Sequence, residues 1–517
     1  MTAFPAAEPQ RIVYQRPWLC AALVLASLLL SWWAIHLDPV INAGGTGSVR
    51  AAQHMLKGRW HEGLELARQP GYSMLIALTS RATGLTAAHG AYALNAGLFA
   101  LLVLGYVALV ETLGALVPGG RRTPWLAALV VLLYPTLNGF RPFVTADVGY
   151  WACYLWSLAW FMHYAATGRR GSLWMWVLAA LAALLFSLEA LFFLLLIPAW
   201  EWARSGSPGG GARARKAVVV LAGIAVLVTY ALWRQAWQSG APAGALLRHP
   251  LHHLAHAGHE TEQGLRFKLE GLRSVFLDQF SRHYDAVALL TIVAVLSVTA
   301  LVKALGLAYT GIAAGAWLGA RRMLPGMVRY WWGIFLVTSV VLLLVPAFTR
   351  FRVLPREAMT AALTVSAIIP VGLERLRRFR AVGESHWRWL WPAVLAVVVV
   401  WGTAGLDLQG DRIELRQAGL WLRTVAAPGR SVYSNSPVVV YYSDLQGNRP
   451  ESRYTWQEAM RMVWSNGWRR YDYLALAIDH SHAYRRRILM RDIHMRPVKV
   501  FTNGAGDRVL IFSRHHK

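Results

Sequence analysis

The stretch Leu19–Ile35 reads LCAALVLASLLLSWWAI and contains no charged residue. Its length approaches the roughly 20 apolar residues that cross the hydrocarbon core of a bilayer as a helix. Comparable runs follow at Ala96–Val110, Val218–Trp233 and Leu390–Leu406. A helix in a water-soluble core rarely stays uniformly apolar for this long. The sequence therefore predicts an all-α polytopic membrane domain.

Composition and charge distribution agree with this class. The 517 residues are 56% hydrophobic and 15% charged. Much of the net charge of +26 falls in short connectors, which is typical of cytoplasmic loops because Lys and Arg resist translocation. These connectors contain Arg121–Arg122, Arg169–Arg170, Arg204 with Arg213, Arg215 and Lys216, Arg321–Arg322, and Arg375 to Arg380. The distribution argues against nucleic acid as a partner.

The apolar runs can be threaded through the inner membrane from the first one. Arg11 and Arg16 precede it without a clear cleavage site, so we expect an uncleaved first span and a cytoplasmic N-terminus. The threading gives about eleven spans and puts all the basic connectors on the cytoplasmic side. The spans lie near 18–36, 89–115, 123–140, 147–167, 172–187, 190–203, 217–235, 286–319, 330–348, 357–373 and 388–404. The run 286–319 is either one long tilted helix or two short ones, and two would reverse everything downstream.

Three segments then face the extracytoplasmic side. They are a first loop at 37–88, a histidine-rich loop at 236–285 and the tail. We divide the chain into a transmembrane domain at 1–404 and a small soluble α/β domain at 405–517. In the tail, Arg430–Ser434 and Tyr473–Ile478 are typical of buried strands, and the run NGAGD at 503–507 between apolar strands indicates a hairpin.

A collinear series of short motifs runs through nearly the whole chain. The motifs are Arg50-Ala51-Ala52, LKGRW at 56–60, QPGYSMLIAL at 69–78, Gly84-Leu85, Leu94-Asn95, Tyr134-Pro135, Thr145-Ala146-Asp147, RFRVLP at 350–355, GLWL at 419–422, SNSP at 434–437, and Phe501-Thr502-Asn503 through Val509-Leu510-Ile511. In this order they resemble the GT-C-fold glycosyltransferases, which include the aminoarabinose and protein-mannosyl transferases. Each motif is weak by itself, and their order carries the resemblance.

The resemblance implies a GT-C fold, a polyprenyl-phosphate sugar donor and a lipid or glycan acceptor. It also implies an acidic residue in the first loop that acts as catalytic base or metal ligand. In this chain the matching position falls within Ala43–Thr46, where no carboxylate occurs. A requirement for a divalent metal is left open, and no metal ligand is assigned.

Two carboxylates are the candidate catalytic residues. Asp147 opens a predicted span, and the resemblance makes it the second acidic residue of the active site. Its alternative role is to stabilise the start of a helix. Asp38 follows the first span and is a candidate replacement for the missing base, since a base needs only to reach the acceptor hydroxyl. Glu62 and Glu65 also lie in the first loop and could supply the carboxylate, but a solvated loop face explains them better.

The candidate substrate-binding residues are Arg352, Arg68, Arg141 and Glu189. A guanidinium suits a lipid phosphate, and the resemblance gives Arg352 that role. Arg68 precedes Gln69-Pro70 as a second phosphate ligand, and Arg141 lies just before Asp147. Glu189 interrupts the apolar run 173–197, so either two short spans turn there or its carboxylate pairs with an arginine.

The resemblance implies a transferase that moves a sugar from a polyprenyl-phosphate carrier. Two alternatives stay open. A non-catalytic protein that binds a lipid-linked glycan is favoured by the missing first-loop acid. A transporter would show inverted repeats and broken helices in mid-span. The histidines of the loop 236–285 complete no recognised metal set, and an interfacial helix explains them better.

Overall fold

The computed structural model describes most of the chain. The described residues are 17–67, 69–116, 123–205, 284–320, 324–374, 392–393, 396–400, 412–427, 429–445, 447, 454–482 and 484–514, together with 266 and 270. The histidine-rich loop predicted at 236–285 lies almost entirely outside them, as does Arg68.

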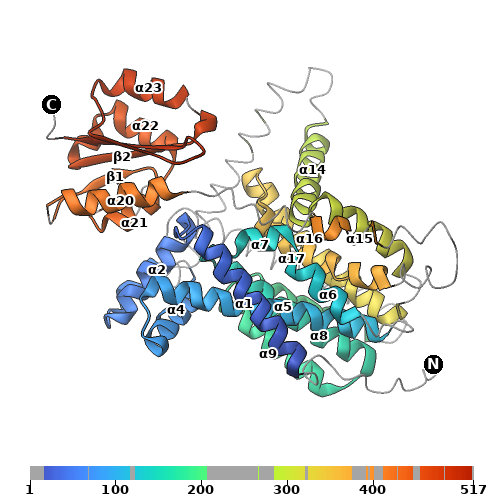
Figure 1. Cartoon of the computed structure of the whole chain (residues 1–517). Coiled ribbons are helices and arrows are strands. Elements are labelled where there is room, and N and C mark those ends of the chain that lie inside the picture. Colours follow the sequence, from blue (N-terminus) through green and yellow to red (C-terminus); the bar gives the residue numbers. More distant parts are fainter. Residues whose placement is uncertain are drawn as a thin grey trace.

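Helices build the described chain up to residue 374 (Figure 1). They are α1 (Pro17–Leu37), α2 (Ala43–Leu56), α3 (Trp60–Leu66), α4 (Pro70–Thr83), α5 (Ala87–Ala115), α6 (Thr123–Leu132), α7 (Pro135–Phe140), α8 (Asp147–Thr167), α9 (Arg170–Leu184), α10 (Ala190–Ser205), α14 (Asp285–Leu305), α15 (Leu307–Ala320), α16 (Gly326–Arg350) and α17 (Pro355–Ser366).

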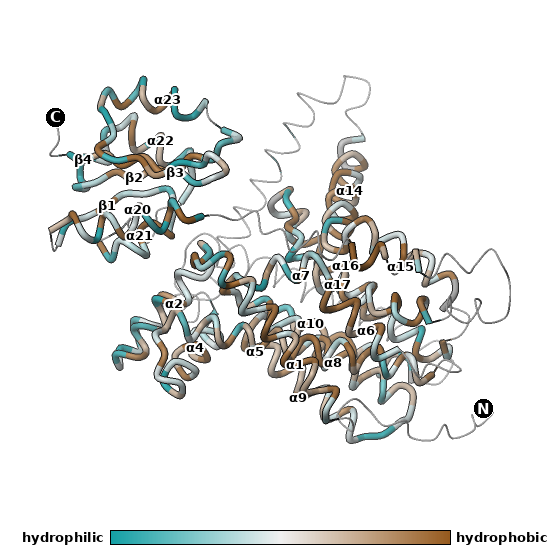
Figure 2. Tube along the Cα trace, viewed as in Figure 1, coloured by the Kyte–Doolittle hydropathy of each residue, from teal (hydrophilic) through white to brown (hydrophobic). Residues whose placement is uncertain are grey.

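Five helices of the described chain are long and apolar enough to cross a membrane. They are Pro17–Leu37, Ala87–Ala115, Val287–Leu305, Gly326–Thr349 and Pro355–Glu374. Figure 2 shows that hydrophobic residues dominate these helices, whereas hydrophilic residues are frequent in the C-terminal part. These helices indicate a membrane protein, as the sequence predicts.

Helix α5 forms the centre of the bundle. It is 29 residues long, and the structure buries 67% of its most apolar window, against 28% for α1. Helices α8, α1, α4 and α6 all pack on it. Helix α8 approaches closely because a side-chain carbon on Gly105 would lie 2.9 Å from the ring of Trp156.

Two runs that we predicted as single spans are broken helices. The run 123–140 is interrupted between α6 and α7, because Pro135 cannot continue the hydrogen bonding of α6 and instead begins α7. The run 286–319 consists of α14 and α15, which meet at Gly306 with φ +78°. The run therefore folds as two helices and not as one long tilted helix.

The first loop folds into the three helices α2, α3 and α4. Helix α4 starts with Pro70 at its first position, where the missing N–H costs nothing. It ends at Gly84, whose left-handed conformation (φ +71°) suits a residue without a Cβ. Helix α4 packs on both α5 and α2, so the loop is fixed to the bundle.

Residues 412–514, called the C-terminal unit below, form a four-stranded sheet with helices on both faces. Strands β1 and β2 are parallel, β4 is antiparallel to β2, and the order is β1-β2-β4-β3. The strands are β1 (Val432–Ser434), β2 (Tyr473–Ile478), β3 (Lys499–Thr502) and β4 (Arg508–Ser513). The helices are α20 (Ile413–Val425), α21 (Pro437–Ser443), α22 (Trp456–Trp464) and α23 (Tyr484–Ile493), with short 3-10 turns at Gly467–Arg470 and His480–His482.

The sheet separates two apolar layers. Helices α22 and α23 cover one face, where Leu474 and Phe512 are fully buried. Helices α20 and α21 cover the other face, where Ala475 and Ile511 are fully buried. Alternate residues of a strand point to opposite faces, so each strand contributes to both layers.

We predict that Gly71→Ala destabilises the bundle by about 1–3 kcal/mol. A Cβ on Gly71 in α4 would lie 2.6 Å from the carbonyl oxygen of Leu185, so backbone would have to move. The matched control is Gly97→Ala in α5, where a Cβ meets nothing within 4 Å and helix propensity favours alanine by about 0.5–1 kcal/mol. Thermal unfolding in detergent should lower the midpoint for Gly71→Ala alone, and equal midpoints would contradict the packing.

Candidate functional site

Asn95 of α5 holds the loop 141–146 that leads into α8. Its side-chain amide is fully buried and donates to the carbonyl oxygen of Phe143 at 2.6 Å and to that of Thr145 at 3.5 Å. Its carbonyl oxygen accepts from the Tyr72 hydroxyl at 2.6 Å. One buried amide thus joins α4, α5 and the loop before Asp147.

Asp147 is the first residue of α8 and is half-buried. Its Oδ2 accepts a hydrogen bond from Thr145 Oγ1 at 2.9 Å. The N-cap is Ala146, so Asp147 does not cap the helix, although its charge suits the helix start. Within the described chain, its Oδ1 accepts no hydrogen bond. One carboxylate oxygen of Asp147 is therefore available at a rigid helix end.

Tyr72 lies close to Asp147, and sequence reasoning did not single it out as a site residue. Burial raises the pKa of the Tyr72 phenol well above its usual range, and the negative charge of Asp147 raises this pKa further. Tyr72 therefore remains the protonated donor to Asn95. A polar residue inside an apolar stretch, such as Asn95 in α5, is the signal that could have found this pair.

Helices α5 and α8 run in the same direction. Asn95 lies beside Thr145, and further along both helices the Trp156 indole N–H donates to the carbonyl oxygen of Leu101 at 3.0 Å. The start of α8 is consequently level with Asn95, and both helices run from there toward the opposite end of the bundle.

Arg352 lies at the same end of the bundle as the start of α8. Tyr154 of α8 shares a hydrogen bond of 2.7 Å with Thr364 of α17, and Tyr106 of α5 donates to the carbonyl oxygen of Ser366 at 2.8 Å. Ser366 lies further along α17 than Thr364, and its partner Tyr106 lies further from Asn95 than Tyr154 does. Helix α17 therefore runs parallel to α8. The loop before α17, which carries Arg352, is then level with the start of α8.

The Arg352 side chain is exposed and forms no ion pair with any described residue. Phe351 ends α16 in the left-handed conformation, with φ +54°. The turn separates α16 from α17, which begins at Pro355. An unpaired guanidinium beside a span is suited to an anionic group such as a phosphate.

Glu189 belongs to a turn at 185–189 between α9 and α10. The run 173–197 breaks here into the two short helices α9 and α10. Phe186 of this turn packs against the first helical turn of α8, where a Cβ on Gly149 would lie 2.3 Å from the Phe186 ring. Glu189 is half-buried and lies at the Asp147 end of the bundle.

Arg141 is buried to 1% exposure and is held by neutral groups. It donates to Asn138 Oδ1 at 2.8 Å, to Ser31 Oγ at 2.8 Å and to the Ser27 carbonyl oxygen at 3.0 Å. Its guanidinium lies 4.8 Å from the centroid of the Phe99 ring. These contacts favour a structural role for Arg141, which links α1 to the loop 141–146.

Asp38 forms an ion pair with the C-terminal unit. Its side chain is 5% exposed, and its Oδ2 accepts from Arg412 Nη2 at 2.5 Å. The Arg412 guanidinium also lies 4.9 Å from the centroid of the Phe143 ring. A carboxylate engaged in this way is poorly suited to be a base, so the contacts favour a structural role for Asp38.

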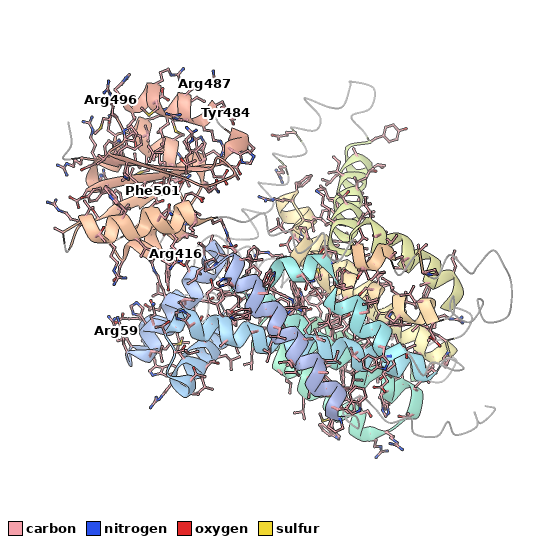
Figure 3. All side chains as sticks on the ribbon, in the orientation of Figure 1. Arg59, Arg416, Tyr484, Arg487, Arg496 and Phe501 are labelled. Carbon is pink, nitrogen blue, oxygen red and sulfur yellow. The ribbon has the colours of Figure 1, made fainter. Side chains whose placement is uncertain are left out.

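The α20–α21 face of the C-terminal unit contacts the first loop. Arg50 of α2 donates to the carbonyl oxygen of Val440 at 2.8 Å, and the backbone N–H of Ile41 donates to the Tyr442 hydroxyl at 3.2 Å. Figure 3 shows Arg416 on the side of the unit that is turned toward the first loop. The C-terminal unit therefore packs on the first loop.

Close packing surrounds Gly45, one of the residues 43–46 among which the resemblance implies a first-loop acid. A Cβ on Gly45 would lie 2.7 Å from Val144 Cβ and 2.9 Å from the Val144 carbonyl oxygen. Asn42 completes the contact, because its Oδ1 accepts from the Val144 N–H at 2.7 Å. Any side chain at residue 45 would push away the loop that carries Asp147. Glu62 is exposed and pairs with His54 and Arg59.

Among the described residues, one group has the donor atoms and spacing of a metal site. Asp479, His480 and Asp507 gather at the end of β2, with ligand atoms within 4.8 Å of one another. His480 Nδ1 lies 2.9 Å from Asp507 Oδ1, and this bond raises the pKa of the His480 imidazole. The group belongs to the C-terminal unit and includes no candidate site residue.

Several solved structures share this fold. ArnT from Cupriavidus metallidurans bound to undecaprenyl phosphate is 13% identical, with a TM-score of 0.51 over 95% of this chain and 97% of that one. The oligosaccharyltransferase of Archaeoglobus fulgidus in complex with Zn and sulfate is 10% identical, with a TM-score of 0.53 over 94% and 72%. The archaeal oligosaccharyltransferase AglB of the same organism, with an inhibitory peptide and a dolichol-phosphate, is 10% identical, with a TM-score of 0.50 over 96% and 74%.

Both kinds of protein are glycosyltransferases of the GT-C fold. The chain has this fold, and the resemblance that the motifs indicated is confirmed. No protein-family model and no curated protein sequence matches the chain.

We predict that Asp38 and Arg412 are coupled. Arg412→Gln leaves the buried Asp38 carboxylate without this cation and should cost about 3–5 kcal/mol, whereas Asp38→Asn leaves Arg412, which is 25% exposed, and should cost less. The double variant should lose less than the sum of the two, with a coupling energy of about 1–3 kcal/mol. The matched control is the exposed pair Glu458–Arg461, worth about 0.2–1 kcal/mol. Unfolding of the full chain in detergent measures the free energy of unfolding of the single variants, the double variant and the control pair. If the losses of free energy for Asp38→Asn and Arg412→Gln were additive in the double variant, the pairing would be contradicted.

Proposed function

We propose that the chain is a membrane glycosyltransferase that moves a sugar from a polyprenyl-phosphate donor to a lipid or glycan acceptor on the extracytoplasmic face. The observation that carries the proposal is Asp147. Its half-buried carboxylate has an uncommitted oxygen and is fixed at the start of α8 by the Asn95 network. The GT-C fold supports the same reaction class.

The donor class is supported by the solved structures of similar fold. ArnT was crystallised with undecaprenyl phosphate and AglB with a dolichol-phosphate. Both ligands are polyprenyl phosphates. A site for such a lipid needs a cation at the membrane surface, and the exposed Arg352 meets this need.

In the proposed reaction, Asp147 accepts the proton of the acceptor hydroxyl. The hydroxyl oxygen then forms a bond to the anomeric carbon of the sugar. The bond between this carbon and the phosphate oxygen breaks, and the lipid phosphate leaves with the electron pair. Arg352 stabilises the charge that develops on the phosphate. Asp147 is also the residue that would hold a divalent cation if the reaction uses one, because carboxylates are preferred ligands of such ions.

The topology that fits this function has about eleven spans, a cytoplasmic N-terminus and an extracytoplasmic C-terminal unit. We propose that α14 and α15 together cross the membrane once. Supporting this, Tyr309 near the start of α15 donates to the carbonyl oxygen of Val130 inside the bundle at 3.0 Å. Ala316 then packs on Gly372, which lies beyond the C-terminal end of α17. We keep the division into a transmembrane domain at 1–404 and a soluble domain at 405–517.

A second candidate function is favoured by the absence of a carboxylate at 43–46. Packing closes residue 45 to a larger side chain, and without a first-loop acid the chain would bind a lipid-linked glycan and not transfer the sugar. The two functions differ in whether the Asp147 carboxylate is required.

We predict that Asp147→Asn lowers transfer about 10²–10⁴-fold, because an amide cannot accept the acceptor proton. Cells that lack the chain are complemented with each variant, and mass spectrometry quantifies the envelope glycan that depends on the wild-type chain. Asp147→Glu keeps the carboxylate and should retain more product than Asp147→Asn. Glu65→Gln, an exposed first-loop control, should retain full activity. Full product with Asp147→Asn at wild-type abundance would support the non-catalytic function instead.

A further inference from the structure

A cavity of about 340 Å³ lies between α8, α9 and α10, away from the residues considered so far. This volume falls at the lower end of the roughly 300–1,000 Å³ typical of ligand pockets. Aromatic and aliphatic side chains form most of its wall, including Phe161, Trp174, Trp176 and Ile197. A ligand that fills it must therefore have a largely apolar body.

Trp176 forms part of the buried wall of this cavity. The side chain is 3% exposed. The ring is fixed, because it packs edge-on against Phe161 with 5.4 Å between centroids. The wall therefore offers a ligand a rigid aromatic surface.

The cavity lies at the end of the bundle opposite Asp147. Phe161 belongs to the last two turns of α8, and α9 begins beyond it at Arg170. The mouth faces outward, since Trp174 on its rim is 69% exposed. A mouth on the outer surface of a membrane bundle is open to lipid.

Cationic side chains stand next to this mouth. Arg169 and Arg170 are exposed and pair with no carboxylate among the described residues. Glu201 also lines the cavity, but Arg204 neutralises its charge at 2.6 Å. The local charge therefore favours an anionic ligand.

We propose that this cavity binds an anionic phospholipid of the leaflet that the basic connectors assign to the cytoplasm. One acyl chain enters the cavity, and the phosphate faces Arg169 and Arg170. The proposal is independent of the transferase function, because it rests on the opposite end of the bundle.

The test uses the full chain purified in detergent, with phosphatidylglycerol or phosphatidylcholine added as probes. Native mass spectrometry counts the lipids that remain bound. We expect one phosphatidylglycerol to be retained in preference to phosphatidylcholine. Val177→Phe fills the cavity and should lower the retention of both lipids.

Charge variants separate headgroup recognition from chain binding. Arg169→Gln with Arg170→Gln should abolish the preference for phosphatidylglycerol and leave chain binding. The matched control is Arg469→Gln with Arg470→Gln, an exposed pair on the C-terminal unit. This variant should behave as wild type. Unchanged retention in Val177→Phe, or a polyprenyl phosphate retained in place of phosphatidylglycerol, would overturn the proposal.

Discussion

The hydrogen bonds of the Asn95 side chain fix the part of the molecule on which the proposed site depends. A carboxamide inside an apolar bundle must satisfy both its donor and its acceptor, because an unpaired amide there costs several kcal/mol. Asn95 does so by joining Tyr72 of α4 to the carbonyl oxygens of the loop 141–146. The position of Asp147 follows from this loop, which also receives Asn42 from the first-loop side.

This constraint separates polar residues that look alike in the sequence. Asp38 and Asp147 both stand at helix ends, but Asp38 is committed to Arg412, whereas Asp147 keeps an open oxygen. Arg141 and Arg352 differ in the same way, since neutral groups surround Arg141 and Arg352 is exposed. The available carboxylate and the available cation lie at the same end of the bundle, which is the arrangement that transfer from a lipid phosphate requires.

Local chemistry made much of the fold predictable. Long apolar runs indicated α1 and α5, and the strand expected at Tyr473–Ile478 has these bounds in the structure. The motif ending in Asp147 correctly placed a helix start. Tertiary contacts were not predictable in this way. Nothing local reveals that Asp38 meets Arg412, far along the chain, or that Gly45 packs on Val144. The break at Gly306 also depends on context, because glycine is frequent inside membrane helices.

A structure of the chain with a bound polyprenyl phosphate would test the central claim most directly. The measurement is the position of the lipid phosphate relative to the start of α8 and the loop before α17. The account predicts that the phosphate contacts the Arg352 guanidinium and leaves room for an acceptor hydroxyl within hydrogen-bond reach of Asp147. A phosphate bound away from Arg352, with Asp147 closed off by protein side chains, would contradict it.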